Sequence, residues 1–151
     1  MSYHLSLTVG NNFQSVERLK VWQKSMDLVE LSYRLSSRLP ADERFGLISQ
    51  IRRAATSIPA NIAEGYGRWN APDFARFVSI ASGSLRELET HFRIAGRLGY
   101  LDLASVERAL RETGEISKML YRMRRRVLAN IAVAHAKTRF GSTGASKLPG
   151  S

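Results

Sequence analysis

The chain contains no cysteine, and this absence excludes disulfide bonds and thiolate metal sites. It has no hydrophobic run approaching the roughly 20 residues that a membrane-spanning helix needs. Residues 1–12 have neither the basic start nor the long apolar stretch of a signal peptide. We therefore expect no membrane association and a cytoplasmic location.

Acidic side chains are scarce, with 13 against 23 lysines and arginines, which leaves a net charge of +10. None follows Glu115, so the positive excess is concentrated in the last quarter of the chain. Most of the basic residues are arginines, whose planar fork binds phosphate through two hydrogen bonds. This pattern favours RNA or DNA as a partner, bound through phosphate contacts. A charge that only keeps the protein in solution is the alternative.

Motifs for catalysis or cofactor binding are also missing. His4, His91 and His135 lie in separate segments, and neither His91 nor His135 follows a glutamate by three residues, as a di-iron bundle requires. The HExxH and GxSxG patterns do not occur. Residues 65–68 lack the Gly-Lys-Ser/Thr of a phosphate-binding loop. We expect a protein that is not an enzyme and that holds no metal or cofactor.

Helical periodicity is present in four long segments, and no segment alternates at period two. We predict one helix that ends before Pro40 and further helices at about 43–66, 71–99 and 103–136. Short loops join them, so the expected fold is all-α, an antiparallel up-down-up-down four-helix bundle over residues 15–139. Residues 1–14 are expected to form an N-terminal arm, and residues 140–151 a flexible tail.

Two residues mark expected features of these helices. Asn70 is a plausible N-cap of the third helix, because its side chain can accept a hydrogen bond from the first turn. Pro59 lies inside the second periodic segment and removes a backbone donor. We expect a kinked helix there, with two shorter helices as the other possibility.

Two helical surfaces predict a homo-oligomer. One face of the first helix combines Leu19, Trp22, Met26, Val29 and Tyr33, and further leucines widen it. So broad a face indicates burial on more than one side. The second helix offers small residues that let another helix come close, namely Ala54, Ala55, Ser57, Ala60 and Ala63.

The last predicted helix carries the candidate nucleic-acid-binding residues. Helical spacing places cations along one stripe, interrupted by Glu115, on the side opposite the apolar positions. The stripe and its flanking arginine comprise Arg108, Arg111, Lys118, Arg122, Arg125 and Arg126. Such a stripe can follow phosphates. A solvated face, or favourable charge near a helix C-terminus, is the alternative.

A second group is expected at an oligomer interface or in structural contacts. Adjacent Arg52 and Arg53 point about 100° apart on a helix, so one can face solvent while the other pairs with Glu64 or another subunit. Trp69 beside an arginine can stack on a base, and we favour a subunit contact. The remaining members, which capping and hydrogen bonds between helices account for, are Asn61, Glu64, Tyr66 and Arg68.

Five segments carry a family resemblance: LKVWQ at 19–23, FGLISQIRRAA at 45–55, SIPANIAEG at 57–65, GSLRELE at 83–89 and LGYL at 98–101. Over residues 13–125 the chain resembles the four-helix-bundle protein family first noticed in intervening sequences of bacterial large-subunit rRNA genes. That family is similar to the accessory variability determinant of diversity-generating retroelements. The resemblance implies a basic pentamer that binds nucleic acid and a reverse transcriptase. A structural or protein-interaction bundle with no nucleic-acid role is the alternative.

Overall fold

The structure, a computed structural model, describes residues 15–68 and 70–141. The predicted arm, Trp69 and the tail from residue 142 onward lie outside the described residues. The helices are α1 (Lys20–Ser36), α2 (Leu47–Tyr66), α3 (Ala71–Arg97) and α4 (Leu103–Gly141). Short 3-10 turns, η1 (Val16–Arg18) and η2 (Ala41–Glu43), precede α1 and α2.

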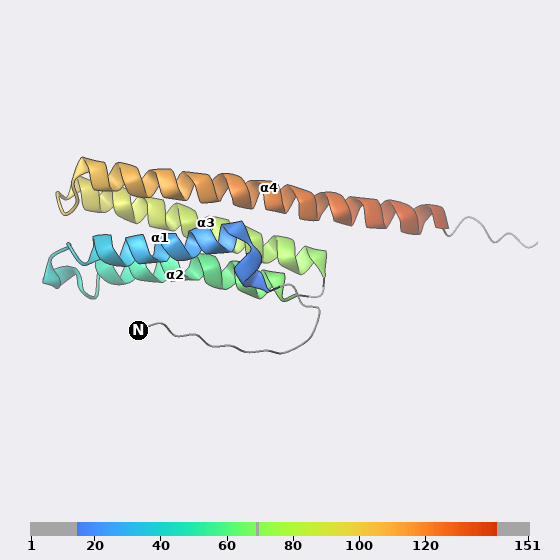
Figure 1. The fold of residues 1–151 in the computed structure, drawn as a ribbon, viewed down its shortest axis with the longest axis horizontal. Helices are drawn as coiled ribbons and strands as arrows, with labels where there is room; N and C mark the ends of the chain where they lie inside the picture. Colours follow the sequence, from blue (N-terminus) through green and yellow to red (C-terminus); the bar gives the residue numbers. More distant parts are fainter. Residues whose placement is uncertain (1–14, 69, 142–151) are drawn as a thin grey trace, which may run out of the picture.

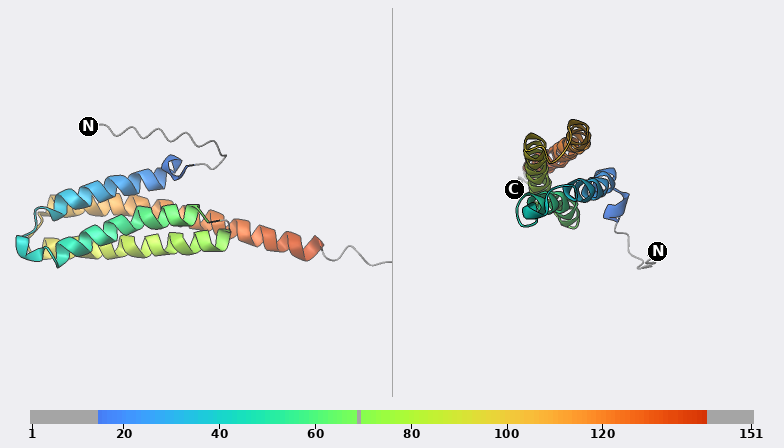
Figure 2. Two further views of the ribbon diagram at one scale, coloured as in Figure 1. Left: turned by 90° about the horizontal axis from the view of Figure 1, so that it is seen from below. Right: turned by 90° about the vertical axis from the view of Figure 1, so that its left-hand side faces the viewer.

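These helices form the predicted antiparallel, up-down-up-down bundle, and no strand occurs in residues 15–68 or 70–141 (Figure 1). The α1–α2 and α3–α4 connections lie at one end, and the α2–α3 connection at the other. Contacts run from α1 to α2, from α2 to α3, from α3 to α4 and from α4 back to α1. Because α4 has 39 residues and α3 has 27, α4 extends past the other three helices (Figure 2).

The helix ends follow local chemistry, and two predicted ends were wrong. Asn70 caps α3 as expected, since its Oδ1 accepts from the Asp73 N–H at 2.8 Å. Helix α2 begins at Leu47 and not near Glu43, because the Glu43 carboxylate caps it from outside by accepting from the Leu47 N–H at 2.9 Å. Helix α4 continues five residues beyond the predicted end, to Gly141.

Pro59 lies inside α2, which continues as one helix on both sides of it. The alternative of two shorter helices is therefore wrong, and the bend at this residue stays a prediction. The proline ring is buried. It is therefore enclosed by the bundle.

The side of α1 that is buried in the single chain covers only part of the broad face predicted. Its buried residues are Val21, Ser25, Leu28, Leu31, Ser32, Leu35 and Ser36. Met26 and Tyr33, expected at the centre of the face, remain 40% and 42% exposed. Serine can take core positions because its hydroxyl bonds to its own helix, as where Ser32 Oγ donates to the Leu28 carbonyl at 2.7 Å.

The small residues of α2 serve packing within the chain. Ala54 and Ala55 are buried, so the neighbouring helix can approach closely. One turn further on, the Ser57 and Ser84 hydroxyls form a hydrogen bond of 2.8 Å between α2 and α3. Part of the surface that predicted an oligomer is therefore occupied by α3.

Two glycines distinguish tight from open packing in this bundle. In Gly65→Ala the new Cβ would lie 2.7 Å from the Phe77 Cβ, and overpacking of this kind costs about 1–3 kcal/mol of unfolding free energy. In Gly114→Ala the new Cβ meets nothing within 4 Å, so helix propensity should stabilise the protein by roughly 0.5–1 kcal/mol. Urea unfolding of both variants measures the difference. Equal shifts in the two variants would contradict the close α2–α3 contact at Gly65.

Candidate nucleic-acid interface

Helix α4 divides into an apolar and a basic side. Its buried side includes Val106, Ile116, Leu120 and Val127. All six cations of the predicted stripe are exposed, and we call them the basic face: Arg108, Arg111, Lys118, Arg122, Arg125 and Arg126. The structure therefore brings these side chains to one surface of one helix. Trp69, from the second predicted group, lies outside the described residues.

Carboxylates lie beside the first half of the basic face. Glu115 pairs with Lys24 of α1 at 2.5 Å, and hydrogen bonding and attraction by this ammonium lower the pKa of the Glu115 carboxyl. Arg108 lines a groove with Asp27 and Glu112. The Lys24–Glu115 ion pair is exposed to solvent, so it adds little stability. The Asp27 and Glu112 carboxylates reduce the positive potential beside Arg108.

The second half of the basic face carries unbalanced charge. No acidic residue follows Glu115 in the sequence. Within the part of the chain that the structure describes, Arg122, Arg125 and Arg126 make no salt bridge with any carboxylate. Unpaired, exposed guanidinium groups are free to bind phosphate in pairs of hydrogen bonds.

An exposed tyrosine, which the sequence analysis missed, lies on this surface. Tyr121 is 64% exposed, and the Arg125 guanidinium lies 5.9 Å from its ring centre. The i,i+4 spacing of the two residues was the available signal. Arg124 has a different role, because its Nε donates to Ser79 Oγ at 3.0 Å and ties α4 to α3.

Arg52 and Arg53 differ as their spacing predicted, although neither pairs with Glu64. The Arg52 Nε donates to Ser36 Oγ at 3.0 Å, and its guanidinium lies 4.6 Å from the Tyr33 ring centre. Arg52 therefore joins α2 to α1 with no carboxylate in contact. Arg53 is exposed, and among residues 15–68 and 70–141 its guanidinium donates to Gln50 Oε1 of its own helix, at 3.1 Å.

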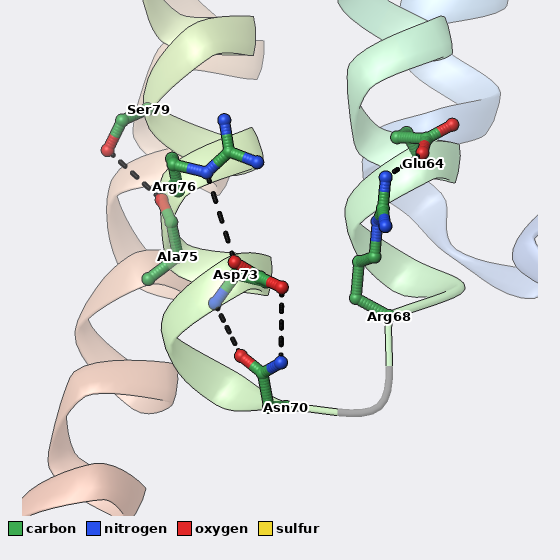
Figure 3. A network of polar contacts seen from close by, with 7 residues as sticks. All are labelled: Glu64, Arg68, Asn70, Asp73, Ala75, Arg76 and Ser79. Carbon is green, nitrogen blue, oxygen red and sulfur yellow. Dashed lines mark hydrogen bonds and ion pairs between the residues drawn. The ribbon is translucent and has the colours of Figure 1, made fainter.

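The corner between α2 and α3 holds Glu64 and Arg68 of the second predicted group (Figure 3). Glu64 forms its ion pair with Arg68 within this corner, and the Arg68 guanidinium also lies 5.1 Å from the Phe77 ring centre. Asn61 Nδ2 donates to the Ser57 carbonyl at 2.8 Å.

Tyr66 belongs to the same corner and packs edge-on against Phe74, with 6.2 Å between ring centres. This contact joins the end of α2 to the start of α3. Together with the Glu64–Arg68 ion pair, it fits the structural alternative for the second group.

The remaining titratable groups assemble no further site. Glu87 and His91 lie together on α3, with 3.4 Å between Oε1 and Nε2. No group of three potential metal ligands occurs among the residues described, and His4 lies outside them. None of the described helices is long and apolar enough to cross a membrane.

The profile of the 23S rRNA-intervening sequence proteins matches residues 17–122. The chain belongs to this family. A similar solved structure is that of a protein of unknown function from the S23 ribosomal protein family of Bacteroides thetaiotaomicron VPI-5482, with 28% identity and a TM-score of 0.64. The alignment covers 68% of this chain and 96% of that one. No match was found among curated proteins.

Membership of the 23S rRNA-intervening sequence protein family accounts for most of the bundle but only part of the basic face. The match includes α1, α2, α3 and the first half of α4. It ends at Arg122, so Arg125, Arg126 and the projecting end of α4 lie beyond it. These residues must be interpreted from their own geometry.

The neighbouring arginines of α2 provide a test of the structural contacts. Arg52→Lys should lower the unfolding free energy by about 1–2 kcal/mol. A lysine cannot reproduce both the guanidinium hydrogen bond to Ser36 and the stacking on the Tyr33 ring. Arg53→Lys should change it by less than about 0.5 kcal/mol, since Arg53 is exposed. Thermal unfolding compares the two variants. A larger loss for Arg53 would show that the contacts of Arg52 do not hold α1 to α2.

Proposed function

We propose that this protein is a non-enzymatic, cytoplasmic accessory protein that binds RNA or DNA as a homo-oligomeric ring. The basic face of α4 contacts the phosphates, and the likeness of the family to retroelement accessory proteins makes a reverse transcriptase the favoured protein partner. The observation that carries the proposal is the set of exposed arginines, Arg122, Arg125 and Arg126, with no carboxylate paired to them. Nucleic-acid binding draws its affinity from such contacts.

The length of α4 argues against helix stabilisation as the role of these arginines. Attraction between a cation and the helix dipole falls off within the last turn. Helix α4 ends at Gly141, so Arg126 lies about four turns before the end. Lys137 and Arg139 are close enough to the end to stabilise it, and Arg122, Arg125 and Arg126 are not.

The outward part of α1 supports an oligomer. Met26 and Tyr33 are apolar or aromatic, and each is about 40% exposed in the single chain. Trp22, one turn before Met26, is only half-buried. A subunit packed on this surface would bury all three side chains, as interface cores do. The family resemblance makes five the favoured number of subunits.

One observation favours a second function, that of a protein-interaction bundle. At the end formed by the α1–α2 and α3–α4 connections, Phe45 is 89% exposed and Leu103 is 73% exposed. The two connections are joined where Tyr100 donates to Glu43 at 3.4 Å. Exposed apolar residues mark protein-binding sites where they form one contiguous patch.

A neutralised basic face tests the proposed function. In this variant the last four cations of the basic face are changed to glutamine. It should keep its fold, because these side chains are exposed, and it should bind RNA and DNA far more weakly. Each phosphate contact removed should reduce the slope of log K against log salt by roughly 0.9 for duplex DNA. Fluorescence anisotropy at several salt concentrations measures both effects. The substitutions are Lys118→Gln, Arg122→Gln, Arg125→Gln and Arg126→Gln.

A control with the same loss of charge separates local contacts from net charge. It carries Arg38→Gln, Arg44→Gln, Arg53→Gln and Arg97→Gln, all at exposed positions outside the basic face. This control should retain most of the affinity and the salt slope. Equal weakening in both variants would attribute binding to net charge, and an unchanged affinity in the first variant would refute the role of the basic face.

The oligomer is tested by mass in solution. Light scattering should give a multiple of the 16.9 kDa chain mass, with five copies favoured. Met26→Glu should reduce this mass, because a charge would be buried without a partner at the proposed interface. A mass of one chain for the unaltered protein would contradict the proposal.

A further inference from the structure

Beside the basic face, a groove opens where α1 and α3 begin on either side of α4. Its volume is about 480 Å³, within the range of about 300–1,000 Å³ typical of small-ligand sites. We call it the methionine groove, because Met119 and Met123 of α4 line it together with Leu19 beside α1 and Phe74 of α3. Both methionines are half-buried, so their side chains pack on the core and still reach solvent.

Three cations line the same groove, and no acidic residue does. Arg122 and Arg126 come from the basic face, and Lys20 comes from the first turn of α1. The two arginines lie four residues apart, about 6 Å along α4. The methionine groove is thus an apolar surface bordered by positive charge from two helices.

We infer that the methionine groove holds an unstacked base of single-stranded RNA or DNA, with the flanking phosphates on Lys20, Arg122 and Arg126. Methionine sulfur makes favourable contacts with aromatic rings, and arginine planes stack on bases. The combination of apolar surface and cations matches a nucleotide, which joins an aromatic ring to a phosphate. The inference rests on the proposed function and makes it specific for single strands.

A duplex does not present the unstacked base that the methionine groove accepts. Its bases are paired and stacked, so it offers only phosphates unless a base is flipped out, which costs a few kcal/mol. A single strand exposes its bases, and contacts between a base and a side chain strengthen binding substantially at each such position. The basic face therefore binds both forms, and the groove favours the single strand.

The test uses the full-length protein and labelled oligonucleotides of about 12 nucleotides, a length within the range of single-strand binding sites. The double variant Met119→Gln and Met123→Gln removes apolar surface without changing charge. It should lose about tenfold in affinity for a single strand, while its affinity for a duplex and its salt slope stay unchanged. The double variant Ile80→Gln and Ile94→Gln changes two exposed apolar residues of α3 outside the groove. It is the matched control and should bind both forms as the unaltered protein does.

A second measurement does not depend on how the variant folds. An abasic strand keeps the phosphates and lacks the bases, so the unaltered protein should bind it about tenfold more weakly than the normal strand. The methionine double variant should bind the normal and the abasic strand with equal affinity. Removing the bases and replacing the methionines abolish the same contact, so the two effects do not add.

The possible outcomes test the role of the groove independently of the role of the basic face. Equal binding of normal and abasic strands by the unaltered protein would overturn the inference and leave the basic face intact. A methionine double variant whose mass in light scattering differs from that of the unaltered protein would show a subunit contact in the groove, and would also overturn it. If the four glutamine substitutions of the basic face leave binding unchanged, the proposed function itself fails.

Discussion

Helix α4 buries a single narrow stripe, and the two helices in contact with it, α1 and α3, determine which stripe that is. Val106, Ile116 and Leu120 are buried against them. With 3.6 residues per turn, positions 111, 118, 122 and 125 must then face solvent. Arginine and lysine are almost never fully buried without partners. The packing that closes the bundle therefore also separates apolar from basic side chains along α4, and the basic face needs no scaffold of its own.

The unequal helix lengths have a second consequence at the end where α1 and α3 begin. Only α4 continues past that end (Figure 1). Its apolar stripe is no longer fully covered there, and Met119 and Met123 are left half-buried. Arg122 and Arg126 lie on the same turns of the helix. The methionine groove therefore occurs where the apolar stripe and the unpaired arginines meet.

The sequence was sufficient for the helices because the spacing of apolar residues depends on helix geometry alone. It was not sufficient for the orientation of α1. Apolar spacing alone did not show which part of the broad face is buried in the single chain. Met26 and Tyr33 stay partly exposed, whereas Ser25 and Ser32 occupy the core by bonding to their own helix. The start of α2 was missed for a related reason, since Glu43 caps the helix from four residues outside it. Side-chain hydrogen bonds to the backbone leave no mark in a hydrophobicity pattern.

The candidate site was predictable to the same limited extent. One helix supplies all six residues of the basic face, so spacing along that helix was enough to place them together. The groove needs Lys20 and Phe74 from two other helices, and no local pattern brings these residues to Met123. The balance of charge was equally hidden, because Lys24 neutralises Glu115 across a distance of 91 residues in the sequence. Contacts of that kind depend on the order and lengths of all four helices.

The charge of the last quarter of the chain has two physical origins. Residues 128–139 are exposed apart from the half-buried Ile131, so the bundle gives this part of α4 little support. A short helix without packing is only marginally stable in water. Alanine at positions 129, 132, 134 and 136 raises its helix propensity, and Lys137 and Arg139 oppose the negative end of the dipole. These two cations are explained by helix stability. Arg122, Arg125 and Arg126 lie instead between Leu120 and Val127, two positions that are still buried against the bundle. The arginines near the groove are thus the ones whose charge helix stability does not explain.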